Sequence, residues 1–159
     1  MSEGGDSRLG LTVVHRRYVP YAHAHYAGNL VDGAYSLGLF GDVATEVCIR
    51  TDGDEGLFAA YEDVRFLAPV RAGDVLEVTA RVVAVGNRSR RLELTVHVVC
   101  RGRPDVAPSA AEVLPEPLLA TSAVGTVVVP VPADRPPAGS DTPQTRESIR
   151  SPESQEGPA

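Results

Sequence analysis

Apolar and polar residues alternate with a period of two in two stretches of the chain, residues 76–82 and 92–98. Successive side chains of a β-strand point to opposite faces of a sheet, so this alternation predicts two strands that each bury one face. Between them stands Gly86-Asn87, a dipeptide typical of a hairpin turn. Further strands are predicted over residues 11–18, 57–67 and 118–129, the last of them after a proline-rich connection over 103–117.

From residue 30 the apolar residues recur at helical spacing, which predicts one long helix. Its expected buried face consists of Leu30, Ala34, Leu37, Gly41, Ala44 and Cys48. The turn Asp52-Gly53-Asp54 is expected to end this helix. Each glycine at positions 33, 38 and 41 lowers helix propensity by roughly 1 kcal/mol relative to alanine. Such residues suggest that a sheet approaches the helix closely around them.

A strand, a long helix and then four antiparallel strands predict an α+β domain in which the sheet wraps around one helix, the hotdog fold. We expect this domain to span residues 10–130, between a disordered segment 1–9 and a disordered tail 131–159 rich in Pro, Ser and Glu. A sheet of this size leaves an edge strand unpaired. Pairing of two such edges predicts a homodimer or a larger assembly of dimers.

The composition excludes several classes of function. A net charge of −6 argues against a general nucleic-acid binder. All fifteen basic residues are arginine, which excludes a Schiff-base lysine. No signal-like start and no membrane-length apolar run is present, so we expect a cytoplasmic protein without a membrane partner. His23 and His25 lack a third ligand at metal-site spacing, and Cys48 and Cys100 are expected to be reduced and buried.

The loop from His25 to Asn29 comes directly before the predicted helix. A glycine loop that leads into a helix presents free N–H groups and the positive end of the helix dipole, which suit an oxyanion at a thioester carbonyl. The competing interpretation is a capped helix start, with Asn29 as the N-cap and His25 hydrogen-bonded locally.

Three other charged groups each allow a structural and a functional interpretation. Glu46 on the helix lies four residues from Asp42 and from Arg50, so it supports an ion-pair ladder, or Asp42 or Glu46 acts as a general base in a cleft at a dimer interface. Tyr61, Asp63 and Arg65 are expected on one face of their strand, where Arg65 forms a surface ion pair or clamps an anion. The arginines around Asn87 and Arg88 suit the phosphates of coenzyme A, or form a charged hairpin tip.

The motifs of one family occur in order along residues 25–89: HY-x-GNLV-x-GA, GDV-x-TE, DGD-x-x-LF, V-x-F-x-APV-x-x-GD and GN-x-S. This run resembles the β-aminoacyl-CoA ammonia-lyases, which act on β-alanyl-CoA and 3-aminobutyryl-CoA, and the similarity extends from about residue 22 to 129. The resemblance implies a hotdog fold, an acyl-CoA thioester substrate, no cofactor beyond coenzyme A itself, and sites shared between subunits. It also implies that His25, Gly28 and Asn29 border the thioester and that Asp52 and Tyr61 lie near the acyl group.

Two positions depart from the family pattern. Arg65 stands where the family carries a glutamate that acts as acid and base, and His23 stands where an aspartate is typical. A guanidinium cannot act as an ordinary base and repels an ammonium group, so we expect weak release of ammonia from β-aminoacyl-CoA and better use of a substrate that carries a carboxylate. The base role then falls to Asp52, Glu46 or His23.

Alternatives to a lyase are an acyl-CoA or acyl-carrier thioesterase and a non-catalytic CoA-binding protein. The candidates are therefore His25, Glu46, Asp52 and Arg65 for catalysis, and His23, Gly28, Asn29, Tyr61, Asn87 and Arg88 for substrate binding.

Overall fold

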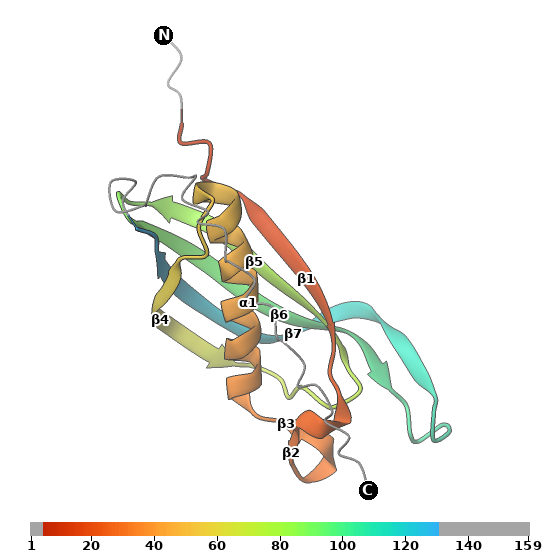
Figure 1. Ribbon diagram of the computed structural model, residues 1–159. Coiled ribbons are helices and arrows are strands. Elements are labelled where there is room, and N and C mark those ends of the chain that lie inside the picture. The colour runs from red at the N-terminus through yellow and green to blue at the C-terminus, as the bar shows by residue number, and fades with distance from the viewer. Residues whose placement is uncertain (1–4, 131–159) are drawn as a thin grey trace, which may run out of the picture.

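The computed structural model describes residues 5–130, which form a five-stranded antiparallel sheet curved around one long helix (Figure 1). In chain order the main elements are β1 (Thr12–Tyr18), α1 (Gly33–Asp52), β4 (Leu57–Phe66), β5 (Val75–Val85), β6 (Ser89–Gly102) and β7 (Ala111–Val128). The sheet has the order β1-β5-β6-β7-β4, so β1 and β4 are its edges. The predicted α+β arrangement of a sheet around one helix is therefore confirmed. The predicted tail 131–159 lies outside the described residues.

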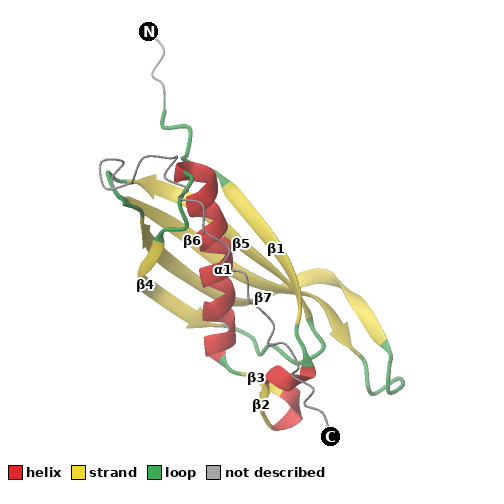
Figure 2. Cartoon of the chain, viewed as in Figure 1, coloured by secondary structure: helices red, strands yellow, loops and turns green. Residues whose placement is uncertain are grey.

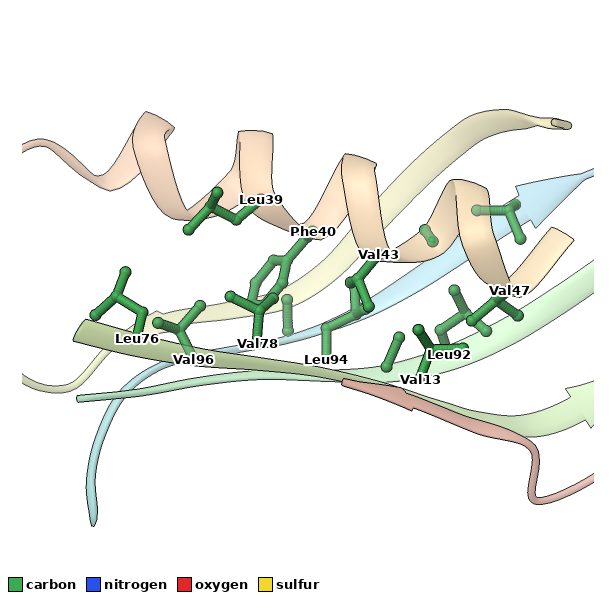
Figure 3. Packing of buried hydrophobic residues seen from close by; sticks show 14 of the residues in the cluster. Val13, Leu39, Phe40, Val43, Val47, Leu76, Val78, Leu92, Leu94 and Val96 are labelled. Carbon is green, nitrogen blue, oxygen red and sulfur yellow. The ribbon is translucent and has the colours of Figure 1, made fainter. Parts of the chain in front are cut away.

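The core lies between the inner face of the sheet and one side of α1 (Figure 3). Every second residue over 76–82 of β5 and 92–98 of β6 is buried there, as the alternating pattern predicts. These residues are Leu76, Val78, Ala80 and Val82 in β5 and Leu92, Leu94, Val96 and Val98 in β6. Phe40 and Val43 of α1 pack against them. Burial of this apolar surface holds the helix in the sheet.

The helix begins three residues later than the predicted start. Leu30 and Val31 form the short strand β3 (Leu30–Val31), which pairs with β2 (Ala24–Tyr26). The N-cap is Asp32, whose carboxylate accepts a hydrogen bond from the backbone N–H of Tyr35 at 3.0 Å. The prediction of Asn29 as the N-cap is therefore wrong, because the strand pairing of residues 30 and 31 delays the first helical turn. The predicted helix end is confirmed, with Gly53 at a φ of 65°.

The buried face of α1 differs from the predicted one. It consists of Ser36, Leu39, Phe40, Val43, Ala44, Val47 and Cys48. Of the predicted face only Ala44 and Cys48 are buried, because the sheet covers a stripe centred on the large residues Phe40, Val43 and Val47. A Cβ added at Gly38 or Gly41 would meet nothing of residues 5–130 within 4 Å, so the predicted close approach is wrong at these two glycines. It holds at Gly33, where an added Cβ would lie 2.5 Å from the ring of Phe66.

Strand β4 does not keep the regular alternation expected of it. Its register against β7 shifts between Glu62 and Arg65, and Asp63 has a φ of 51°. Arg65 pairs with Ser122, which alternates with buried residues of β7 and so belongs to the outer face of the sheet. Tyr61 instead points toward α1, where its hydroxyl donates to the carbonyl of Leu37 at 2.9 Å. The prediction that Tyr61, Asp63 and Arg65 share a face is wrong because the bulge turns the strand between them.

β7 begins seven residues before its predicted start, and its first part continues the ladder with β6 as a hairpin arm (Figure 2). Val98 pairs with Leu118 and Cys100 with Val113, so the register jumps over Pro115 and Pro117. Prolines lack the N–H that a ladder needs and are accommodated at such a bulge. The segment 103–117 is therefore partly strand rather than a plain connection.

The N-terminal residues 5–9 take part in the domain, so the predicted disordered segment 1–9 is too long. The backbone N–H of Leu9 donates to the carbonyl of Asp6 at 3.0 Å, which closes a turn. Arg8 reaches from this turn to Asp52 at the end of α1, at 3.3 Å. Residues 1–4 lie outside the described part of the chain.

Candidate active site

A cavity of about 420 Å³ lies where the N-terminal end of α1 meets the end of β4. Its lining includes Tyr26, Asp32, Gly33, Ser36, Phe66 and Thr121. The first backbone N–H groups of a helix have no partner within the helix and carry the positive end of its dipole. This end of the cavity is therefore suited to a carbonyl oxygen that gains negative charge.

The polar side chains that line this cavity are Tyr26, Asp32, Ser36 and Thr121, and His25 lies beside Asp32. The carboxylate of Asp32 lies 3.7 Å from Nδ1 of His25, which is more than half exposed. Deeper in, the hydroxyl of Thr121 donates to that of Ser36 at 3.2 Å, and both residues are buried. A carboxylate near an exposed imidazole supplies a group that can accept a proton and a group that can relay it.

A second cavity of about 610 Å³ lies on the other side of a short backbone ladder. Gly28 and Asn29 line it, both at positive φ, of 72° and 59°. The carbonyl of Asn29 accepts the N–H of Ala72 at 2.9 Å, which forms part of the ladder between the two cavities. The loop from His25 to Asn29 therefore contributes to both cavities, with Tyr26 lining the smaller one and Gly28 and Asn29 lining the larger one. The predicted residues His25, Gly28 and Asn29 lie together at this end of the molecule.

His23 lies in a 3₁₀ turn that precedes β2. Its ring is 4.7 Å from that of Tyr35 on α1, and the ring of His25 packs edge-on against Tyr26 at 4.5 Å. These contacts hold both imidazoles near the start of α1 while leaving them accessible.

Asp52 lies at the opposite end of α1, about 30 Å away along a helix of 20 residues. Its carboxylate forms a bidentate ion pair with the buried guanidinium of Arg90. Nε of Arg90 donates to Oδ2 at 3.0 Å, and Nη2 donates to Oδ1. Partial burial alone would raise the pKa of Asp52, but the hydrogen bonds from Arg90 and Thr51 hold it below its usual value. Within one chain Asp52 therefore stabilises the helix end, and its predicted role in catalysis stays a prediction.

Glu46 lies on the side of α1 that faces β1, away from both cavities. Its carboxylate is 2.5 Å from Nε2 of His15 and 2.7 Å from Arg50. The hydrogen bond with His15, followed by that with Arg50, lowers the pKa of Glu46. This geometry matches the ion-pair interpretation of the ladder, extended to a residue of β1 that the sequence pattern did not indicate.

Tyr61 stacks on Phe58 at 4.0 Å and closes the core beside α1. Burial raises the pKa of Tyr61, so its hydroxyl stays protonated at neutral pH. Arg65, 64% exposed, forms a surface ion pair with Asp63 at 3.0 Å. Within one chain, neither side chain enters the cavity at the start of α1.

The hairpin between β5 and β6 has its arginines engaged within the protein. Arg90 is buried, Arg91 pairs with Glu62 at 2.7 Å, and Arg88 donates to the carbonyl of Val129 at 3.3 Å. Asn87 is exposed at the tip. The hairpin tip is therefore less free to bind phosphate than its sequence suggested.

Sequence reasoning missed Asp32, Ser36 and Thr121. Asp32 stands directly before Gly33-Ala34, a position that an N-cap preference identifies once the helix start is placed correctly. No local pattern indicates Ser36 and Thr121, because they meet across 85 positions of the chain.

Among residues 5–130 no group of three or more His, Cys, Asp or Glu side chains is placed to hold a metal ion. Within the same residues, no helix is both long and apolar enough to cross a membrane. Cys48 and Cys100 are both free, Cys48 buried as expected and Cys100 only partly so. Burial raises the pKa of the Cys48 thiol to about 11, so it is protonated at neutral pH.

This fold and this cavity define a hotdog domain, and residues 28–103 match the family model described as "Thioesterase superfamily". Over 107 residues the chain is 52% identical to 3-aminobutyryl-CoA ammonia lyase of Acetoanaerobium sticklandii. The matched region covers 67% of this chain and 85% of that protein. The solved β-alanyl-CoA:ammonia lyase from Clostridium propionicum superposes with a TM-score of 0.72 and 35% identity, over 76% of this chain and 86% of that one. The chain belongs to the β-aminoacyl-CoA ammonia-lyase family, as its motifs predicted.

A hexameric thioesterase from Yersinia pestis shares the fold more distantly. Its TM-score is 0.61 and its identity 20%, over 80% of this chain and 93% of that one. At this level the similarity concerns the fold alone.

Proposed function

We propose that the protein is an acyl-CoA lyase that eliminates or adds a group at the β-carbon of a short acyl-CoA thioester. The observation that carries this proposal is the 52% identity to a 3-aminobutyryl-CoA ammonia lyase, which spans most of that protein. Coenzyme A enters as part of the substrate, and the proposed chemistry needs no further cofactor.

In this proposal the thioester carbonyl binds against the first turn of α1 in the smaller cavity. Gly33 has no side chain to obstruct the approach, and the N–H groups of this turn stabilise the negative charge of an enolate. A thioester acidifies its α-proton, so the site needs one base beside the α-carbon and hydrogen-bond donors at the carbonyl oxygen. Loss of the α-proton and departure of the β-substituent then leave an enoyl-CoA.

Asp32 and His25 are the groups best placed to move this proton. Asp32 lines the smaller cavity, and His25 lies 3.7 Å from it on the solvent side. Asp32 accepts the α-proton as general base, and His25 passes it to solvent or to the departing ammonia. His23 stands beside this pair as a second imidazole, near Tyr35.

A second copy of the chain would complete the site. β4 is an edge strand, and the cavity borders its end at Phe66. Antiparallel pairing of two β4 edges sets the two helices antiparallel, which carries the C-terminal end of one helix toward the N-terminal end of the other. In such a homodimer, Asp52 and the hairpin residues Asn87 and Arg88 approach the cavity of the other copy, and Arg65 lies in the strand that forms the shared edge.

A panel of thioesters tests the proposal. The protein is incubated with β-alanyl-CoA, 3-aminobutyryl-CoA and a short acyl-CoA that carries a β-carboxylate, while ammonia, enoyl absorbance and free thiol are recorded. Enoyl absorbance that grows without free thiol supports a lyase. Free thiol without enoyl product identifies a thioesterase, and thermal stabilisation by acyl-CoA without turnover identifies a binding protein. Either of the last two results overturns the proposed function.

A further inference from the structure

The larger cavity, of about 610 Å³, plays no part in the chemistry proposed above. It opens where β1 ends, between the 3₁₀ turn η1 (Tyr21–His23), the turn at residues 71–74 and the arm of β6 and β7. Figure 1 shows this arm and the short strands β2 and β3 at the same end of the molecule. Val31 and Val70 line the smaller cavity and their neighbours Arg71 and Ala72 line the larger one, and the backbone N–H of Val31 donates to the carbonyl of Val70 at 2.9 Å.

The lining of this cavity carries an unmatched positive charge. Its carboxylate is Asp74, which is buried and bound by Arg101 through Nε at 3.0 Å and Nη2 at 2.8 Å. Arg71 also lines the cavity, and its guanidinium has no hydrogen bond or ion pair with any residue in the described range 5–130. In a chain of net charge −6, one free arginine in a hollow is a specific attraction for an anion.

The cavity is also built to keep its shape. Arg101 donates in addition to the carbonyl of Pro69 at 2.9 Å, and Asp74 accepts the backbone N–H of Arg71 at 2.8 Å. The base of the arm is therefore tied to the turn that presents Arg71. A charge held on a fixed turn loses less conformational entropy on binding than one on a mobile loop.

Aromatic and hydroxyl groups complete the lining. The rings of Tyr18 and Tyr21 are both more than half exposed, and Tyr21 lies so near Gly73 that a Cβ there would be 2.8 Å from its hydroxyl. Ser109 and Asn29 add polar side chains. Exposed rings beside a free arginine suit a flat base linked to phosphate.

We propose that the larger cavity binds the phosphate groups of an adenosine nucleotide through Arg71, with the base against Tyr18 or Tyr21. Two sources share this chemistry: the 3′-phosphorylated ADP end of coenzyme A and a free adenine nucleotide. The first rests on the proposed acyl-CoA function, since the adjoining smaller cavity then holds the thioester end. The alternative phosphate site, the hairpin at Arg88, has its arginines engaged by protein oxygens.

Calorimetric titration of the full chain tests this assignment with four ligands: coenzyme A, adenosine 3′,5′-bisphosphate, ADP and pantetheine. Arg71→Ala is compared with Arg81→Ala, which removes an exposed arginine of the outer face. We expect Arg71→Ala to weaken binding of coenzyme A and of the bisphosphate by about tenfold, with pantetheine unchanged. Arg81→Ala stays within about twofold of the unsubstituted protein.

The source of the nucleotide follows from competition. Displacement of the bisphosphate by coenzyme A assigns the cavity to the coenzyme, and simultaneous binding of both assigns it to a free nucleotide; either result supports the phosphate site. Equal affinities of the unsubstituted protein and Arg71→Ala overturn the phosphate site, as does a tenfold loss in Arg88→Ala alone.

If Arg71→Ala weakens binding while no thioester is turned over, the lyase function fails and the phosphate site stands. If turnover occurs with the same KM in both proteins, the site fails and the lyase function stands.

Discussion

Arg90 is buried against the carboxylate of Asp52, and this ion pair ties the last turn of α1 to the hairpin between β5 and β6. Arg90 is 1% exposed and also donates to the carbonyls of Gly86 and Ser89, at 3.0 and 2.8 Å. A buried arginine that loses its carboxylate keeps an uncompensated charge. We therefore predict that Asp52→Asn lowers the free energy of unfolding by about 3 kcal/mol and Tm on the order of 10 °C.

The pH dependence of stability gives a second check on this pair. Because the pKa of Asp52 is lowered below 3.8 in the folded protein, its contribution is present above pH 3.8 and is lost as the pH falls through the folded value. Thermal unfolding between pH 6 and pH 2 measures this loss, and the Asp52→Asn variant should lack that part of it. Glu93→Gln, in an exposed pair 3.9 Å from Arg81, is the control and should change Tm little. Equal effects of the two substitutions would contradict the prediction.

Asp32 combines two roles that substitutions can separate. Asparagine caps a helix about as well as aspartate but cannot accept a proton as a base, whereas alanine loses both functions. We predict that Asp32→Asn keeps Tm nearly unchanged and lowers kcat at least about 100-fold. Asp32→Ala should lose the same activity and in addition about 1 kcal/mol of stability. Measured kcat of Asp32→Asn close to that of the unsubstituted protein would remove Asp32 from the proposed mechanism.

Much of the fold followed from the sequence because it depends on local periodicity. The strands on either side of Gly86-Asn87 alternate over residues 76–82 and 92–98, and both faces of the sheet follow there from that alternation. The start of α1 was missed because Leu30 and Val31 are as apolar as helix residues, and only their pairing with β2 takes them out of the helix. The placement of Arg65 was missed because a bulge at Asp63 leaves no mark in a pattern of period two.

The candidate site was predictable only at its N-terminal part. The loop containing Gly28 was identified because glycine before a helix has a direct physical meaning. The contact of Ser36 with Thr121 and the cavity beside Phe66 arise from tertiary packing, and no spacing along the chain encodes them. Asp52 was assigned near the acyl group by resemblance alone, and the length of α1 separates it from that group within one chain.

Gly33 and Gly38 both lie on α1 but differ in the space around them. A Cβ at Gly33, which lines the smaller cavity, would lie 2.5 Å from the ring of Phe66, whereas a Cβ at Gly38 would meet no atom of the described residues within 4 Å. We predict that Gly33→Ala raises KM for the thioester or lowers kcat by about tenfold or more, at little change in Tm because Phe66 is exposed enough to move. Gly38→Ala should keep its activity and gain up to about 1 kcal/mol of stability from helix propensity. Full activity of Gly33→Ala would show that substrate does not approach this turn.

We predict that Arg65 influences which β-substituent the protein accepts once the β4 edges of two copies pair, because it stands where the family carries a glutamate. Its ion pair with Asp63 is exposed, so substitutions at Arg65 should change the free energy of unfolding by less than about 1 kcal/mol. A positive charge near the substituent disfavours an ammonium group and favours a carboxylate. We predict slow ammonia release from β-alanyl-CoA by the unsubstituted protein.

Arg65→Glu should shift the ratio of kcat/KM values toward β-alanyl-CoA and away from the β-carboxyl thioester by about tenfold or more. The ratio for Arg65→Ala should lie between those of the unsubstituted protein and Arg65→Glu. Arg81→Glu reverses another charge of the outer face and serves as the control, with an unchanged ratio expected. Rapid ammonia release by the unsubstituted protein, together with an unchanged ratio in Arg65→Glu, would place Arg65 outside the site. That outcome would leave the proposed roles of Asp32 and His25 intact, because both lie at the start of α1 and neither contacts Arg65.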